Sequence, residues 1–173
     1  KLLDPRGLPC LQPPYAEMVA IDGNSGDILW RRPLGSAEVY GDIGKDTGSP
    51  NLGGSLATGG GLVFIGATGL GYLGAAVDQP VLRAYDASDG RQVWSARLSS
   101  PAEANPMSFV GRSGRQYVVV ASSGAPRAQA ETALIAFALP RPGEQIVDLK
   151  PAPLPPARPA GQAPAAPVTV TSV

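Results

Sequence analysis

The chain has 173 residues, in which 14 lysine and arginine side chains balance 14 aspartate and glutamate side chains. A neutral chain lacks the basic surface that binds nucleic acids or anionic membranes, so we expect a small-molecule or protein partner. With no histidine and one cysteine, a Ser-His-Asp or Cys-His catalytic system and a Cys/His zinc site are excluded within these residues.

Short apolar runs alternate along the chain with turn formers, among them 22 glycines and 19 prolines. In chain order, strands are predicted at Glu17–Asp22, Asp27–Arg31, Leu62–Ala67, Val81–Asp86, Gln92–Leu98, Gln116–Ser122 and Thr132–Leu139. No stretch shows a sustained helical period, so almost no helix is expected. Many short strands with glycine-rich turns indicate a sandwich, a barrel or a propeller.

The last part of the chain, residues 151–173, is rich in proline and alanine. It has too few large apolar side chains to offset the entropy of ordering, so a disordered or polyproline tail is expected there. No uninterrupted apolar run approaches the ~20 residues that span a bilayer. The chain starts at Lys1 without a signal-like segment. We expect it to be a fragment or a processed product whose targeting signal lies elsewhere.

An internal repeat favours the propeller. Ala20–Trp30 and Ala84–Trp94 share the pattern A-x-D-x-x-x-G-x-x-x-W. This spacing predicts a β-hairpin in which the aspartate accepts hydrogen bonds from turn N–H groups and the glycine supplies a positive φ. The tryptophan is then left to bury its ring against a neighbouring copy, where its N–H needs a carbonyl partner.

A third, degenerate copy is predicted to start at Ala136. In it Ala138 replaces the aspartate, Gly143 comes one position late and Ile146 replaces the tryptophan. Such a copy fits a final, capping unit. The spacing between the two clear copies exceeds the about 40–45 residues of the commonest blades, and we assign the excess to an insertion at Gly69–Pro80.

That insertion contains a G-x-G-x-x-G pattern at Gly69–Gly74, directly after a predicted strand. A dinucleotide-binding fingerprint must open a helix, because the pyrophosphate binds at the helix N-terminus. Only about one turn is available here before Pro80 and the next strand. A Rossmann interpretation is therefore disfavoured.

The repeated motif resembles the tryptophan-docking motif of the eight-bladed quinoprotein dehydrogenases, which hold pyrroloquinoline quinone (PQQ) on the propeller axis. Further segments look like the closing section of the membrane-bound glucose, quinate and polyol dehydrogenase family: Gly7–Cys10, Pro13-Pro14, Gly48–Ser55, Thr58–Ala67, Leu82–Asp86, Asn105–Met107 and Gln116–Val120. The resemblance covers roughly residues 5–140 in preserved order. It implies an all-β partial β-propeller in residues 1–150, with about two four-stranded antiparallel blades of eight.

Two features depart from the family pattern. Family members often carry Gly-Gly-His-Gly after the Q-Y-V-V-x strand, whereas this chain has Ser122–Pro126. The insertion at Gly69–Pro80 is also unusual for this branch.

The resemblance implies PQQ-binding residues at Asn51, Leu52 and Gly53, because in related quinoprotein alcohol dehydrogenases the residues just before this Gly-Gly face the propeller axis. The alternative is that Asn51 only satisfies a turn. Quinoproteins also need a carboxylate base and oxygen ligands for calcium. The acidic residues of this chain lie in turns and loops that do not resemble the family's catalytic segments. No catalytic or metal-binding residue is therefore assigned, and PQQ and calcium are both expected to need upstream blades.

The implied function is part of a dehydrogenase that oxidises a sugar, polyol or cyclic hydroxy acid and passes electrons to quinone. Its expected partners are the alcohol or sugar substrate, ubiquinone and the remaining blades of the parent protein. The parent is expected in the periplasm, anchored to the bacterial inner membrane, and this chain alone is expected to be inactive. The alternative is a non-enzymatic propeller scaffold of the outer-membrane assembly type. The G-x-P-N-L-G-G-S and N-P-M motifs favour the dehydrogenase.

Overall fold

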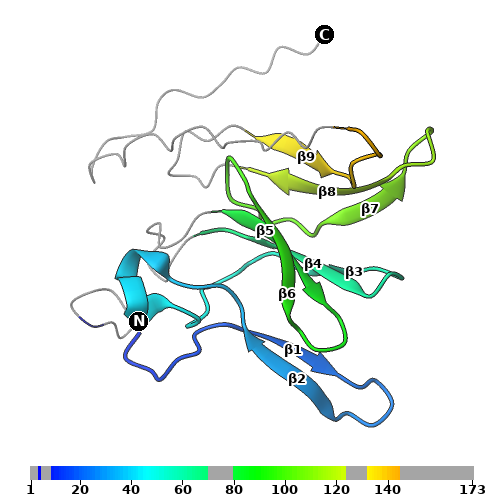
Figure 1. Ribbon diagram of the computed structural model, residues 1–173. Coiled ribbons are helices and arrows are strands. Elements are labelled where there is room, and N and C mark those ends of the chain that lie inside the picture. The colour runs from blue at the N-terminus through cyan, green and yellow to red at the C-terminus, as the bar shows by residue number, and fades with distance from the viewer. Residues whose placement is uncertain (1–3, 5–8, 70–79, 124–131, 145–173) are drawn as a thin grey trace, which may run out of the picture.

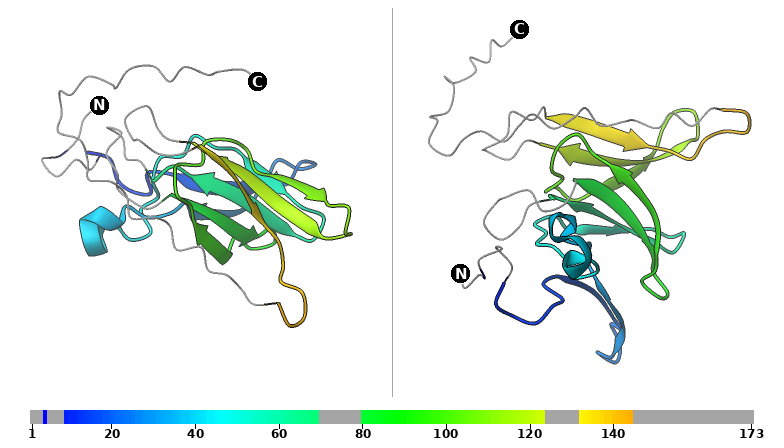
Figure 2. Two further views of the ribbon diagram at one scale, coloured as in Figure 1. Left: turned by 90° about the horizontal axis from the view of Figure 1, so that it is seen from above. Right: turned by 60° about the vertical axis from the view of Figure 1, so that its left-hand side comes forward.

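The computed structural model describes residue 4 and residues 9–69, 80–123 and 132–144. The strands in this part are β1 (Glu17–Ile21), β2 (Ile28–Pro33), β3 (Ser55–Ala57), β4 (Leu62–Ala67), β5 (Val81–Asp86), β6 (Gln92–Arg97), β7 (Met107–Val110), β8 (Gln116–Ser122) and β9 (Ala133–Phe137). They form three antiparallel sheets in the orders β1-β2, β3-β4-β5-β6 and β7-β8-β9. The sheets are stacked in sequence order (Figure 1), as two further views also show (Figure 2).

All the predicted strands are present, with ends that differ by at most two residues. Two strands were missed, β3 and β7, the first strand of its sheet in each case. At three and four residues they are too short to display an alternating pattern. The expected near-absence of helix is confirmed in the described part, where η1 (Glu38–Gly44) consists of two short 3₁₀ pieces joined by a kink at Gly41. The strands amount to about two blades, as one complete sheet and two smaller ones.

The two hairpins that carry the repeat have the same register. Ala20 pairs with Trp30 in the first and Ala84 with Trp94 in the second, and each pair is followed by a register shift. The pattern of side chains that the two copies share therefore produces the same local structure twice. Gly26 and Gly90 adopt φ values of +78° and +70°, as a tight reversal requires.

The aspartate of each copy accepts hydrogen bonds within its turn. Asp22 Oδ1 accepts from the backbone N–H of Asn24 at 2.7 Å, and Asp86 Oδ1 accepts from the backbone N–H of Ser88 at 2.9 Å. The Ser88 hydroxyl also donates to Asp86 Oδ1, at 2.6 Å. These bonds favour the charged carboxylates and lower the pKa of both aspartates, chiefly through Asn24 for Asp22 and through Ser88 for Asp86.

This arrangement gives a pH prediction. Since the folded pKa of Asp86 lies below its unfolded value of about 3.9, the stabilisation is present above that pH and is lost as the pH falls through the folded pKa. Ser88→Ala removes the hydroxyl hydrogen bond, which is the largest cause of the lowered pKa, and should move the pKa of Asp86 upward. The backbone N–H of residue 88 should keep part of the lowering. An NMR titration of the aspartate carboxyl carbons measures both values. Equal pKa values in the two proteins would contradict the role of the Ser88 hydroxyl.

In the second sheet, β5 is buried on both faces, since neighbouring residues of a strand point to opposite sides and a core lies on each side of it. The core between the second and third sheets consists of Leu82, Leu98, Ala102, Val118 and Val120, with Leu56, Phe64, Ile135 and Phe137 packed against it. The core between the first and second sheets consists of Leu34, Ile65 and Tyr85, with Ala16 and Met18. Burial raises the pKa of the Tyr85 phenol. The sheets thus pack face to face like successive blades.

Trp30 joins the first sheet to the second. Its indole Nε1 donates a hydrogen bond to the carbonyl of Ala87, in the β5–β6 turn, at 2.9 Å. Its ring lies against Gly90, where an added Cβ would be 2.5 Å from Trp30 Cε3. The expectation that a repeat tryptophan docks on the neighbouring copy, with its N–H on a carbonyl, is confirmed for Trp30.

Trp94 is placed differently, although it occupies the same position in its own hairpin. It packs edge-to-face on Phe64 of its own sheet and Phe137 of the next, with ring centroids 6.4 and 5.2 Å away. The Trp94 side chain is still 38% exposed, so the expectation that a repeat tryptophan buries its ring against the neighbouring copy is met only in part by Trp94.

The degenerate third copy presents a different partner to Trp94 than the second copy presents to Trp30. Leu139 occupies the position that corresponds to Ala87, and its carbonyl oxygen accepts a hydrogen bond from Arg115 Nη2 at 2.8 Å. Position 138 is an alanine, which cannot accept hydrogen bonds from the turn as the aspartates of the other copies do. In this turn the backbone N–H of Arg141 donates instead to Glu144 Oε2, at 2.8 Å. Glu144 also forms an ion pair with Arg115 at 3.1 Å. The last hairpin is thus closed by an arginine and a glutamate, while Ile146 lies outside the described residues.

Candidate functional site

The expected cofactor residues lie at the end of the sheets where one sheet connects to the next. The hairpin turns gather at the opposite end, whereas η1 and the connection into β3 are on this side (Figure 1). Two connections meet here: residues 34–54 lead into β3, and residues 98–106 lead into β7. The first strands of two adjacent sheets therefore start side by side.

Asn51 is half-buried and organises its own loop. Its Nδ2 donates to the carbonyl of Gly53 at 3.1 Å, and its Oδ1 accepts from the Gly53 N–H at 3.4 Å. Leu52, between them, is 75% exposed. The structure thus supports the turn role of Asn51, and the same bonds present the Leu52 side chain outward.

Gly53 and Gly54 allow close approach of the neighbouring connection. A Cβ on Gly53 would be 3.2 Å from the carbonyl oxygen of Ala102, and one on Gly54 would be 2.3 Å from Asn105 Oδ1. Asn105 Oδ1 accepts a hydrogen bond from the Gly54 N–H at 2.8 Å. Sequence reasoning did not single out Asn105 as a partner of this loop, although its N-P-M motif was one of the family-like segments.

Further bonds hold the second connection, residues 98–106, to the ends of β4 and β8. The N–H of Ala102 donates to the carbonyl of Ala67 at 3.4 Å. The buried Ser122 hydroxyl donates to the carbonyl of Ser100 at 2.7 Å. Because buried polar groups are costly unless paired, these bonds fix the loop end of the second and third sheets as one framework.

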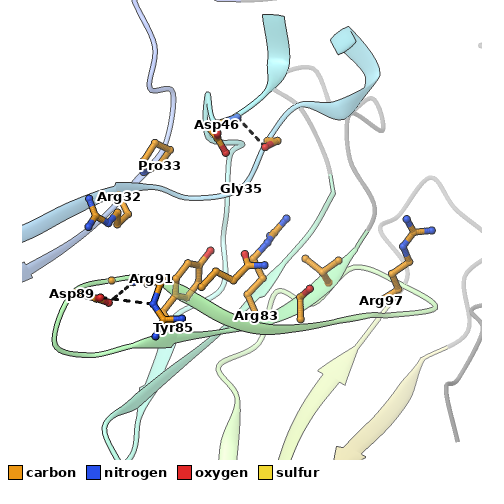
Figure 3. Close-up of a pocket in the computed structure, with 14 residues that line it drawn as sticks. Arg32, Pro33, Gly35, Asp46, Arg83, Tyr85, Asp89, Arg91 and Arg97 are labelled. Atoms are coloured by element: carbon orange, nitrogen blue, oxygen red, sulfur yellow. Dashed lines mark hydrogen bonds and ion pairs between the residues drawn. The ribbon is translucent and has the colours of Figure 1, made fainter. Parts of the chain in front are cut away.

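A separate charged groove lies between the first sheet and the outer strands of the second (Figure 3). Its lining includes Arg32, Gly35, Asp46, Arg83, Tyr85, Asp89, Arg91 and Arg97. Arg91 Nε lies 3.8 Å from Asp89 Oδ2. None of Asn51, Leu52 and Gly53 lines this groove, so it is distinct from the candidate cofactor site.

The loop end fits one side of a planar quinone such as PQQ. The exposed Leu52 side chain offers apolar contact, while the backbone of Gly53 and Gly54 is packed against the connection that contains Ala102 and Asn105. Within the described ranges, no three His, Cys, Asp or Glu residues come together in a group that could hold a metal ion. In the same part of the chain, no helix is long and apolar enough to cross a membrane.

Comparison with known proteins defines the family. The family model of the PQQ "Glucose/ethanol/alcohol dehydrogenase, beta-propeller domain" matches residues 1–118. The chain belongs to this PQQ β-propeller family, which confirms the fold class and the quinoprotein resemblance.

Named relatives share this assignment. The chain is 39% identical over 126 residues to the quinate/shikimate dehydrogenase (quinone) of Acinetobacter baylyi, covering 69% of this chain and 14% of the relative. It is 42% identical over 125 residues to the glycerol dehydrogenase large subunit of Gluconobacter thailandicus, covering 68% of this chain and 16% of that relative. It is 33% identical over 128 residues to the quinoprotein glucose dehydrogenase of Escherichia coli, covering 70% of this chain and 15% of that relative.

The fold also matches a solved structure. The quinohemoprotein alcohol dehydrogenase ADHIIG of Pseudomonas putida HK5 aligns with a TM-score of 0.51 and 22% identity, over 80% of this chain and 18% of that one. The chain therefore spans less than a fifth of the length of these relatives.

Proposed function

We propose that these sheets are the C-terminal blades of a longer eight-bladed PQQ-dependent dehydrogenase. It oxidises a sugar, a polyol or a cyclic hydroxy acid and passes the electrons to ubiquinone. The observation that carries this proposal is the family match over residues 1–118, together with relatives named for quinate, glycerol and glucose. The parent protein is proposed to lie in the periplasm, anchored to the inner membrane.

In this proposal the chain contributes binding rather than proton transfer. PQQ, when bound, accepts the electrons removed from the alcohol. Asn51, Leu52 and Gly53 would hold one side of it at the loop end of the sheets. The catalytic base and the calcium ligands are assigned to upstream blades. The division between blades in residues 1–150 and a disordered tail in 151–173 also remains a prediction, because residues 145–173 lie outside the described part.

The non-enzymatic scaffold is less well supported. The tryptophan-docking repeat is compatible with both proteins, but each relative reported above is a dehydrogenase. The deciding experiment is PQQ-dependent oxidation of quinate, glycerol and glucose by the complete polypeptide with an artificial electron acceptor. Turnover with one of them supports the proposal. A complete polypeptide that neither binds PQQ nor oxidises any of the three would contradict it.

Asn51 provides a residue-level test of the cofactor site. Asn51→Ala removes both hydrogen bonds to Gly53, so the loop should no longer hold Leu52 in place. We expect PQQ to bind the complete apoprotein about ten-fold more weakly, the equivalent of ~1.4 kcal/mol, measured by fluorescence titration. Asn24→Ala, in a hairpin turn at the other end of the sheets, is the matched control and should bind PQQ normally. Equal affinities of all three proteins would remove Asn51 from the cofactor site.

A further inference from the structure

Asn105 bridges the connections that lead into the second and third sheets. It lies two residues before β7, and its partner Gly54 immediately precedes β3. The Gly54 N–H donates to Asn105 Oδ1 at 2.8 Å. An added Gly54 Cβ would lie 2.3, 2.8 and 3.0 Å from Oδ1, Cγ and Nδ2 of Asn105, so the whole amide group of Asn105 packs against the Gly54 backbone.

The loop before β3 needs such an external support. Two successive glycines, Gly53 and Gly54, have no side chains to pack, and glycine loses more conformational freedom on ordering than any other residue. Asn51 restrains only the first of them, through bonds inside the same loop. Asn105 restrains the second one from the connection that leads into the third sheet, 51 residues away.

We propose that Asn105 is a positioning residue for the cofactor, which acts by holding the Asn51–Gly54 loop in its binding conformation. This inference rests on the proposed function. Asn105 acts through its hydrogen bond with the Gly54 N–H, so its effect on the cofactor depends on an acceptor oxygen in the side chain of residue 105. The bond also ties the entry of β3 to the entry of β7, so that the loop is correctly placed only when the third sheet is packed against the second.

The first test follows the Gly54 amide in the complete apoprotein and needs no cofactor. Hydrogen exchange of the Gly54 N–H should be about ten-fold faster in Asn105→Ala, because a lost protection of ~1.4 kcal/mol corresponds to that factor. Asn105→Asp retains the acceptor oxygen and should restore slow exchange. Unchanged exchange in Asn105→Ala would show that Asn105 does not restrain the loop and would overturn the proposal.

The second test links the restraint to the cofactor. Asn105→Ala should bind PQQ about ten-fold more weakly, again ~1.4 kcal/mol, with a melting temperature of the apoprotein close to that of wild type. Asn105→Asp should bind PQQ within about three-fold of wild type, since three-fold is less than 1 kcal/mol. Asn105→Asp binding more weakly than Asn105→Ala would instead indicate direct contact with the carboxylates of PQQ and would overturn the positioning role.

A double-mutant cycle examines the contact itself. Gly54→Ala places a Cβ where the Asn105 amide lies, so it should also weaken PQQ binding. In the double variant the truncated side chain makes room for that Cβ, and the loss should be smaller than the product of the two single losses. Independent effects would contradict coupling through this contact. If wild type binds no PQQ, the proposed function itself fails, whereas wild-type binding with an unaffected Asn105→Ala variant overturns only the role of Asn105.

Discussion

Gly90→Ala is expected to destabilise the protein by about 3 kcal/mol. A non-glycine residue in the left-handed region costs ~1–2 kcal/mol, and φ at Gly90 is +70°. The new Cβ would also come within 2.5 Å of Trp30 Cε3 and 2.8 Å of Arg32 Cγ. The ring of Trp30 must move away, and its hydrogen bond to Ala87, worth ~0.5–1.5 kcal/mol, is lost. Denaturant unfolding of the complete polypeptide, followed by circular dichroism, measures the change.

Gly26→Ala is the matched control for this prediction. Gly26 holds the same position in the first copy and has a φ of +78°, but no atom lies within 4 Å of the Cβ that it would gain. Only the backbone cost of ~1–2 kcal/mol should appear. If Gly90→Ala and Gly26→Ala are equally destabilising, the docking of Trp30 on Gly90 contributes nothing measurable.

Trp30→Ala is expected to cost about 3–4 kcal/mol, within the usual range for truncating a packed aromatic side chain. It removes the ring that covers Gly90 and the hydrogen bond to Ala87 at 2.9 Å. Trp94→Ala should cost less, about 2 kcal/mol. Its ring is 38% exposed, and it contributes mainly edge-to-face packing on Phe64 and Phe137, at ~0.5–1.5 kcal/mol per aromatic pair.

Trp30→Phe separates the two contributions of this residue. It retains most of the ring contact and deletes the donor, so the loss should be about 1 kcal/mol plus the smaller packing area. Thermal melts of the four proteins, wild type included, give the ranking. A larger loss for Trp94→Ala than for Trp30→Ala would mean that the second interface, rather than the first, depends on tryptophan docking.

Much of the local structure follows from the sequence, because each repeat contains its own turn chemistry. The aspartate, the positive-φ glycine and the tryptophan of each copy are separated by fixed spacings. Those spacings specify the hairpin register, which the structure reproduces as Ala20 with Trp30 and Ala84 with Trp94. The short strands β3 and β7 have no such local signal. They form because the rest of each sheet provides an edge for them to pair with.

The candidate site was only partly accessible from the sequence. Asn51, Leu52 and Gly53 were found through their position in a family-like segment, and whether they bind PQQ remains a prediction. Asn105 could not be paired with Gly54 from the sequence, because 51 residues separate them. The two residues meet only when the second and third sheets pack against each other.

The sequence by itself determined the all-β class, the repeat and the turn geometry, since these depend on interactions within about ten residues along the chain. Only the tertiary structure decided which tryptophan docks. Trp30 finds a free carbonyl and a glycine on the next hairpin, whereas the carbonyl of Leu139 that corresponds to Ala87 is already bonded to Arg115. The same motif therefore has two outcomes, because a hydrogen bond between sheets depends on what the partner sheet presents, and the repeat encodes only its own half of that contact.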